Sequence, residues 1–171
     1  MSINHIRQSM EDVIRFYREH PEKAVSTDKA AVAVIQEGLR CRAQGADGAV
    51  LVSDMPAGVG GGGTAPTPGW FMRAALANCD ATLIAMRAAQ LGIVLEALEV
   101  RVDSDSDDRG LLGVVDDVPA GPLGIRIHVR ISAAGVAPEL LHDIVQWAEA
   151  HSPVGDALRR AIPCKTQIEF R

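Results

Sequence analysis

In this sequence of 171 residues, the strongest candidate for a chemically reactive side chain is the thiol of Cys79. It lies at the middle of a nearly all-apolar segment from Pro68 to Leu91, between Asn78 and Asp80. On a helical projection it falls in an apolar arc made of Met72, Ala75, Leu76, Cys79, Leu83 and Met86. A narrow polar stripe lies beside that arc and consists of Arg73, Asp80 and Arg87. Cys79 is therefore either a buried cysteine that acts as a small hydrophobe or a nucleophilic thiol at the bottom of an apolar pocket.

Three other stretches carry residues that could form a site. Arg40 and Arg42 share one face of a predicted strand, opposite Cys41, and are either solvated charges or site residues. The glycine-rich stretch 58–63 contains no GxxxxGK[ST] motif, which argues against a phosphate-binding loop. Its glycines instead predict a backbone that must pass close to another group. The acidic run 103–108 resembles the start of a calcium-binding loop, but such a loop would have Arg109 at a ligand position. Because a cation is no calcium ligand, the run predicts a solvated turn instead.

The pattern of apolar residues predicts a mixed α+β fold of antiparallel strands and helices. Helices are expected at 2–20, at 68–91 between a Thr67 cap and Gly92, at 137–151 and at 154–162. Strands are expected at 31–35, 39–44, 49–53, 95–103, 124–132 and 164–171, with Cys164 facing inward on the last one. Residues 1–28 form an N-terminal helical extension in this interpretation, and residues 29–171 form the main domain.

The composition narrows the class of protein. The net charge of −5 argues against nucleic acid as a partner. The best candidate for a membrane span is interrupted by charged residues, and the N-terminus has no signal-peptide pattern, so a cytoplasmic protein without membrane contact is expected. Three cysteines far apart do not form a disulfide framework.

The long helix is apolar over most of its circumference, which predicts that a second copy covers it in a homodimer. No cofactor and no metal are expected.

Several short segments occur in an order that resembles the OsmC/Ohr family of thiol peroxidases, from about residue 31 to the C-terminus. These segments are Asp54-Met55-Pro56, Gly58–Gly63, Pro66–Pro68, Leu76-Ala77-Asn78-Cys79 and His151-Ser152-Pro153-Val154. The resemblance implies an antiparallel sheet with a long central helix and an intertwined homodimer with two sites at its interface. The implied reaction is reduction of a hydroperoxide by a cysteine thiolate, through a sulfenate and then a disulfide.

The family's catalytic groups are carried over only in part. Cys79 falls on the reactive cysteine, and Arg40, with Arg42 as the alternative, falls on the arginine. Gly69 stands where the family has a glutamate, and Ser152 stands where it has the resolving cysteine. The resemblance therefore implies a hydroperoxide reductase with one reactive cysteine and an external thiol reductant. The alternative is a catalytically degenerate dimer of the same family that binds a small apolar ligand.

Overall fold

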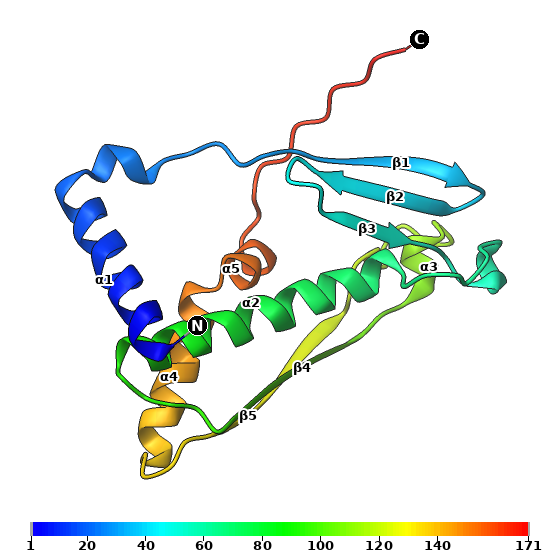
Figure 1. Cartoon of the computed structure of the whole chain (residues 1–171). Helices are drawn as coiled ribbons and strands as arrows, with labels where there is room; N and C mark the ends of the chain where they lie inside the picture. Colours follow the sequence, from blue (N-terminus) through cyan, green and yellow to red (C-terminus); the bar gives the residue numbers. More distant parts are fainter. Residues whose placement is uncertain (1, 171) are drawn as a thin grey trace. The chain divides into compact units, whose positions relative to one another are not determined.

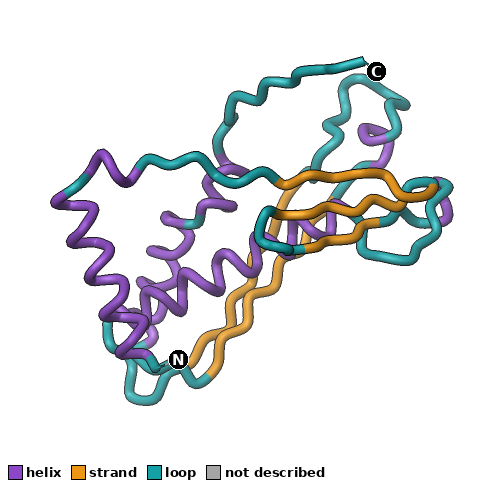
Figure 2. The backbone as a smooth tube through the Cα atoms, turned by 45° about the horizontal axis from the view of Figure 1, so that its top comes forward, coloured by secondary structure: helices purple, strands orange, loops and turns teal. Residues whose placement is uncertain are grey.

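The structure is a computed structural model that describes residues 2–170. Contacts divide the chain into two compact units, Gln8–Ala74 and Met1–Arg7 with Ala75–Arg171. The elements of both units are labelled in Figure 1 and coloured by type in Figure 2. The chain combines helices with antiparallel strands as the sequence predicts, so the α+β class is confirmed.

The unit Gln8–Ala74 contains a three-stranded antiparallel meander (Figure 1). Its strands are β1 (Ala31–Glu37), β2 (Arg40–Gly45) and β3 (Val50–Ser53), in the order β1-β2-β3. Gly48, with φ of 80°, takes the left-handed conformation that the turn between β2 and β3 requires. Two short 3-10 helices, η1 (Pro21–Ala24) and η2 (Ala57–Val59), and the amphipathic helix α1 (Ile3–Glu19), which begins in the other unit, complete this part of the chain.

The second unit is built on the pairing of two long strands, β4 (Ala97–Asp105) and β5 (Gly124–Ser132). They pair over their full length, from Ala97 opposite Ser132 to Asp105 opposite Gly124. The long helix α2 (Pro68–Gln90) and helix α4 (Pro138–His151) supply most of the buried side chains that pack on this ribbon. The fully buried part of this core consists of Ile84, Ala88, Ile93, Ile144 and Ala148. Two short helices, α3 (Asp108–Leu111) and α5 (Pro153–Arg159), follow β4 and α4.

The ends of α2 confirm the predicted caps. Thr67 Oγ1 accepts a hydrogen bond from the backbone N–H of Trp70 at 3.2 Å, and Pro68 is the first helical residue. Gly92 adopts a φ of 72°, the left-handed conformation typical of the position after a helix. The helix that carries Cys79 therefore begins and ends where local sequence signals place it.

Two predictions about buried faces are wrong. Residues 160–170 form no strand, and Cys164 is exposed, because this segment pairs with no other strand in the described chain. Asp80, which the helical projection places in a polar stripe beside the apolar arc, lies on the buried side of α2 and is only 2% exposed. The buried stripe of α2 has residues spaced four apart and is rotated from the predicted arc: it consists of Leu76, Asp80, Ile84 and Ala88.

No helix within residues 2–170 combines the length and the apolar character needed to cross a bilayer.

Candidate functional site

The thiol of Cys79 lies in contact with a hydroxyl group, and both residues belong to the same compact unit. Ser152 Oγ is 3.3 Å from Cys79 Sγ in hydrogen-bonding geometry, with the hydroxyl as donor. Ser152 is 1% exposed, whereas Cys79 on α2 is half-buried. A sulfur that is partly accessible and receives a hydrogen bond from a fixed hydroxyl is a candidate reactive group, since the donor can stabilise negative charge on sulfur or on an oxygen bound to it.

The position of Ser152 follows from two helix ends that meet at this residue. It is the C-cap of α4 and the N-cap of α5. As the N-cap, its Oγ accepts a hydrogen bond from Gly155 N–H at 3.0 Å. Pro153 then occupies the first position of α5, as the sequence predicts. Because Oγ accepts from Gly155, its own hydrogen is free to point toward Cys79, and the cap fixes the donor.

Helix α4 is held beside α2 by an aromatic cluster near the site. The guanidinium carbon of Arg87 lies 4.9 Å from the ring centre of Trp147. The rings of Trp147 and His151 stack at 4.1 Å with an interplanar angle of 15°. His151 Nδ1 is also 2.7 Å from the carbonyl oxygen of Trp147. These contacts link α2 to the residue that directly precedes Ser152, so they help to fix the hydroxyl.

Asp80, the residue after Cys79, is a buried carboxyl group whose Oδ1 has no hydrogen-bond partner in the described part of the chain. Burying such a group costs free energy unless it is compensated. The sequence pattern did not predict this burial, because a single charged residue among apolar neighbours is more often exposed.

The glycine-rich stretch forms a loop around a second buried carboxylate, in the unit Gln8–Ala74. Asp54 is 2% exposed and accepts hydrogen bonds from the backbone N–H groups of Met55 at 2.8 Å, Thr64 at 3.0 Å and Gly62 at 3.3 Å. Gly61 is required for close approach, since a Cβ there would lie 1.9 Å from the carbonyl oxygen of Met55. The prediction of a backbone that must pass close to another group is confirmed.

The loop reaches the predicted arginine through Thr64. Arg40 Nη1 donates to Thr64 Oγ1 at 2.5 Å, and this hydroxyl donates to Asp54 Oδ2 at 2.8 Å. The hydrogen bonds from Thr64, first its backbone N–H and then its hydroxyl, lower the pKa of Asp54 to about 2, with smaller contributions from Met55 and Gly62. Asp54 thus stays ionised and fixes the threonine that holds the Arg40 guanidinium.

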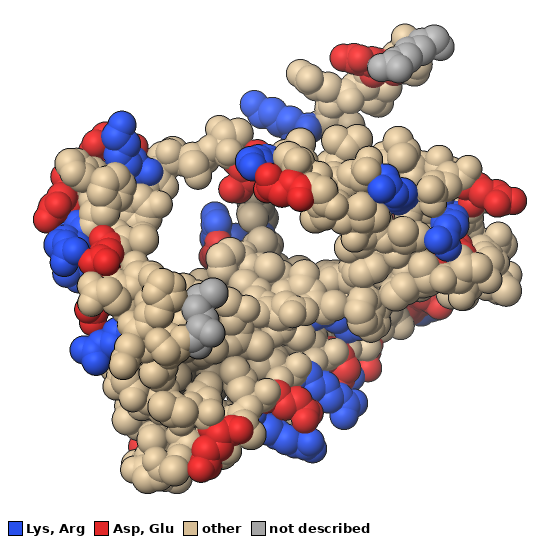
Figure 3. All heavy atoms as spheres, in the orientation of Figure 1, with Lys and Arg blue, Asp and Glu red and all other residues tan. Residues whose placement is uncertain are grey.

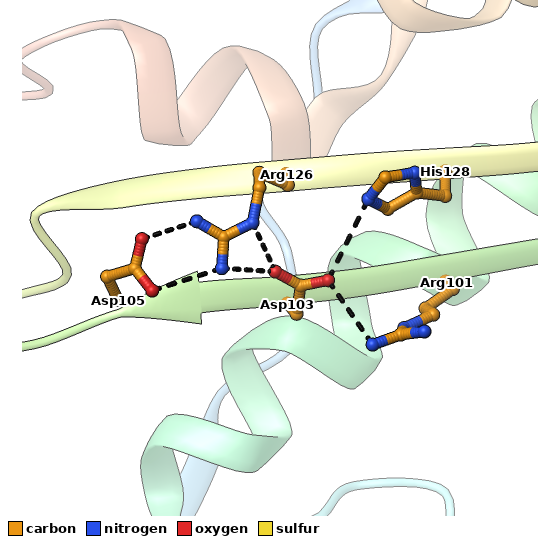
Figure 4. A network of polar contacts seen from close by, with 5 residues as sticks. All are labelled: Arg101, Asp103, Asp105, Arg126 and His128. Carbon is orange, nitrogen blue, oxygen red and sulfur yellow. Dashed lines mark hydrogen bonds and ion pairs between the residues drawn. The ribbon is translucent and has the colours of Figure 1, made fainter.

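The acidic run 103–108 begins on the last residues of β4, and Figure 4 shows the ion pairs of Asp103 and Asp105 from close by. Arg126 contacts both Asp105 and Asp103, with Nε of Arg126 2.6 Å from Oδ1 of Asp103. The side-chain hydrogen bond from Arg126 lowers the pKa of Asp105. Asp107 bonds Arg109 at 2.6 Å and caps α3. Within residues 2–170 no group of His, Cys, Asp or Glu side chains is arranged to hold a metal ion.

Charges of both signs are interspersed on the face seen in Figure 3. Along the β4–β5 ribbon, Glu99 pairs with Arg130 at 3.5 Å, and Arg101 with Asp103 at 3.6 Å. The first pair joins opposite charges on neighbouring strands and the second joins two residues of β4, so this is an exposed, charged sheet face. His128 belongs to it, with its side chain 62% exposed.

The other residues singled out in the sequence have clear positions. Arg42 lies on β2 opposite Val34 and Val52, and Cys41 is half-buried on the same strand. Gly69 lies in the first turn of α2, where an added Cβ would meet only Arg73 Nη1 at 3.8 Å and Thr67 Oγ1 at 3.9 Å. A side chain is therefore sterically possible where the family has its glutamate. The catalytic roles of Cys79 and Arg40 stay predictions.

The candidate site is a hydroxyl that donates to a half-buried thiol on the long helix of an antiparallel α+β scaffold. Comparison with known proteins identifies the family of this scaffold. The model of the OsmC family, described as OsmC-like protein, matches residues 60–167. The match spans more than half of the chain, so the protein belongs to the OsmC-like family. No curated protein matches its sequence.

Solved structures of this family share the fold. An OsmC-like protein from Mycoplasma pneumoniae superposes with a TM-score of 0.67 at 15% identity, covering 80% of this chain and 91% of that one. An organic hydroperoxide resistance protein OsmC from Legionella pneumophila gives 0.59 at 23% identity, with 78% and 92% covered. The organic hydroperoxide resistance protein OhrB of Bacillus subtilis gives 0.50 at 19% identity, with 77% and 92% covered. These likenesses establish the fold.

The environment of Asp54 predicts an acid-sensitive contribution to stability. The pKa of Asp54 in the folded protein is about 2, below the ordinary value of 3.8 for an aspartate. The stabilisation is therefore complete above about pH 4 and is lost as the pH falls toward 2. The difference in melting temperature between wild type and Asp54→Asn should therefore be large at neutral pH and shrink between about pH 4 and 2. Thermal unfolding followed by circular dichroism across this range measures it. A difference that stays constant down to pH 2 would contradict the account.

Proposed function

We propose that this OsmC-like protein is a thiol-dependent hydroperoxide reductase that uses Cys79 as its single reactive cysteine and an external thiol as reductant. The observation that supports this most strongly is the hydrogen bond from Ser152 Oγ to Cys79 Sγ at 3.3 Å. The naming of structural neighbours as organic hydroperoxide resistance proteins supports the same class of activity. The half-buried state of Cys79 leaves its sulfur open to a small substrate.

The first step forms a sulfenic acid. The Cys79 thiolate attacks one peroxide oxygen, the O–O bond breaks, and the alkoxide leaves as an alcohol after taking up a proton. The Ser152 hydroxyl can hold the sulfur during attack and can donate to the sulfenate oxygen afterwards. We assign to Arg40 the orientation of the peroxide, on the strength of the family resemblance, with Thr64 and Asp54 fixing its guanidinium.

The second step has to involve another molecule. A hydroxyl at position 152 cannot form a disulfide, so the thiol of a reductant attacks the sulfenic sulfur and releases water. A second thiol then attacks the mixed disulfide, which yields the oxidised reductant as a disulfide and restores the Cys79 thiol. Cys41 and Cys164 are free cysteines, and Cys164 lies exposed on the segment 160–170.

Turnover of cumene hydroperoxide with a thiol reductant tests this function. Cys79→Ser should abolish catalysed consumption, whereas Cys164→Ser should leave it unchanged. Ser152→Ala should lower the rate constant of Cys79 oxidation about threefold to tenfold, the effect of one lost hydrogen bond to the reacting atom. Stopped-flow kinetics measures these rates, with circular dichroism as a check that each variant is folded.

If wild type consumes peroxide no faster than Cys79→Ser, the reductase proposal is wrong. Native mass spectrometry then distinguishes the ligand-binding alternative, in which a small apolar molecule co-purifies with the protein.

We also propose that the protein works as a homodimer. All seven residues of β1 are exposed, and they include Val32, Val34 and Ile35 at 61%, 55% and 65% exposure. Helix α1 has no buried residue although it is strongly amphipathic, and Val13 and Phe16 are 50% and 46% exposed. Apolar surface of this extent is typical of an interface between subunits.

Light scattering coupled to gel filtration should therefore give twice the chain mass of 18.2 kDa. Val34→Lys, which places a charge on the exposed face of β1, should shift the protein toward the monomer because the charge would be buried on association. Elution of the wild type at the mass of one chain would rule the dimer out.

A further inference from the structure

Arg159, in the last turn of α5, brings a positive charge to the Ser152 side of the thiol site. Its Nη1 lies 3.0 Å from the point that a Cβ of residue 155 would occupy. Ser152 Oγ lies 3.0 Å from the same point, and this hydroxyl donates to Cys79 Sγ. The guanidinium and the hydroxyl therefore lie on the same side of Gly155, around the point that a Cβ would occupy.

The backbone conformation at position 155 does not require glycine. Gly155 is a buried residue within α5 and does not have a positive φ. Glycine weakens a helix relative to alanine, so its presence here requires another reason. A methyl group would crowd both Arg159 Nη1 and Ser152 Oγ, and glycine therefore allows these two groups to approach.

The charge of Arg159 is only partly balanced, because it interacts electrostatically with the Asp156 carboxylate of the same helix without forming an ion pair with it. Its Nη2 donates to the carbonyl oxygen of Glu149 at 2.8 Å, which orients the guanidinium without cancelling its charge. The neighbouring Asp156 is held by Arg160, whose Nε lies 2.7 Å from Oδ2 of Asp156. Between residues 2 and 170 no carboxylate lies within ion-pair distance of Arg159, whose side chain is exposed to solutes.

We propose that Arg159 selects the reductant of Cys79: a low-molecular-weight thiol that carries a carboxylate. This inference rests on the proposed function, which requires an external thiol. The carboxylate of the incoming thiol binds the Arg159 guanidinium, and its sulfur attacks Cys79 Sγ. Arg159 is thus a specificity-determining residue, because it touches the reductant and not the peroxide.

The test uses a reaction that needs no peroxide. In full-length Cys41→Ser/Cys164→Ser protein, 2,2′-dithiodipyridine converts Cys79 to a mixed disulfide with a neutral leaving group. Release of the thiopyridine by 3-mercaptopropionate, 2-mercaptoethanol and cysteamine is then followed by absorbance. Each rate constant is divided by the rate constant of the same thiol with free 2,2′-dithiodipyridine, which removes differences in intrinsic reactivity.

The normalised rate constant should be about fivefold higher for 3-mercaptopropionate than for 2-mercaptoethanol, the scale expected of one exposed charge pair, and cysteamine should be slowest. Arg159→Gln should abolish this order. The control Arg130→Gln, which removes an exposed arginine of the β4–β5 ribbon paired with Glu99, should preserve it. Added salt should reduce the preference.

Absence of a carboxylate preference in wild type, or its persistence in Arg159→Gln, would overturn the inference. Either result leaves the peroxidase assay unaffected, so it counts against Arg159 alone. If instead the preference is present and peroxide is not consumed, the selection of an anionic thiol stands and the reductase function fails.

Discussion

The packing of α4 against α2 determines how close the Ser152 hydroxyl comes to the Cys79 sulfur, and the proposed chemistry depends on this contact. The buried residues Ile84 and Ala88 of α2 and Ile144 and Ala148 of α4 belong to one core cluster. The next residue of the α4 stripe, four positions after Ala148, is Ser152 itself. The same apolar stripe that holds the helices together therefore delivers the hydroxyl to the thiol. A substitution that loosens this core packing would therefore increase the distance between Ser152 Oγ and Cys79 Sγ without changing either residue.

Much of the fold could be predicted from the sequence because its signals are local. Thr67, Pro68 and Gly92 mark the ends of α2, and alternating residues mark β2 and β5. The contact between Cys79 and Ser152 joins residues 73 positions apart, and no local pattern encodes it. The alternation around Cys164 was misleading, because a strand also needs a partner for its backbone groups and the described chain provides none.

Two buried carboxylates show the same limit in different ways. Asp80 was placed in a polar stripe beside the apolar arc, but the core-facing stripe of α2 includes its position. Asp54 was noted only as part of a motif, although four hydrogen bonds make it the centre of the glycine-rich loop. Glycine spacing indicated close approach of the backbone but not the group that is approached. The link from Asp54 through Thr64 to Arg40 became visible only with coordinates.

The central claim is that Ser152 occupies the place of a resolving thiol beside Cys79. Ser152→Cys tests it most directly, since a thiol in contact with Cys79 Sγ would lie within reach of a disulfide. After addition of one equivalent of peroxide, intact-mass and peptide analysis should show the loss of two hydrogens and a disulfide between the introduced thiol and Cys79. Ser152→Cys combined with Cys79→Ser should show neither. A sulfenic or sulfinic acid on Cys79 beside an unreacted introduced thiol would contradict the account.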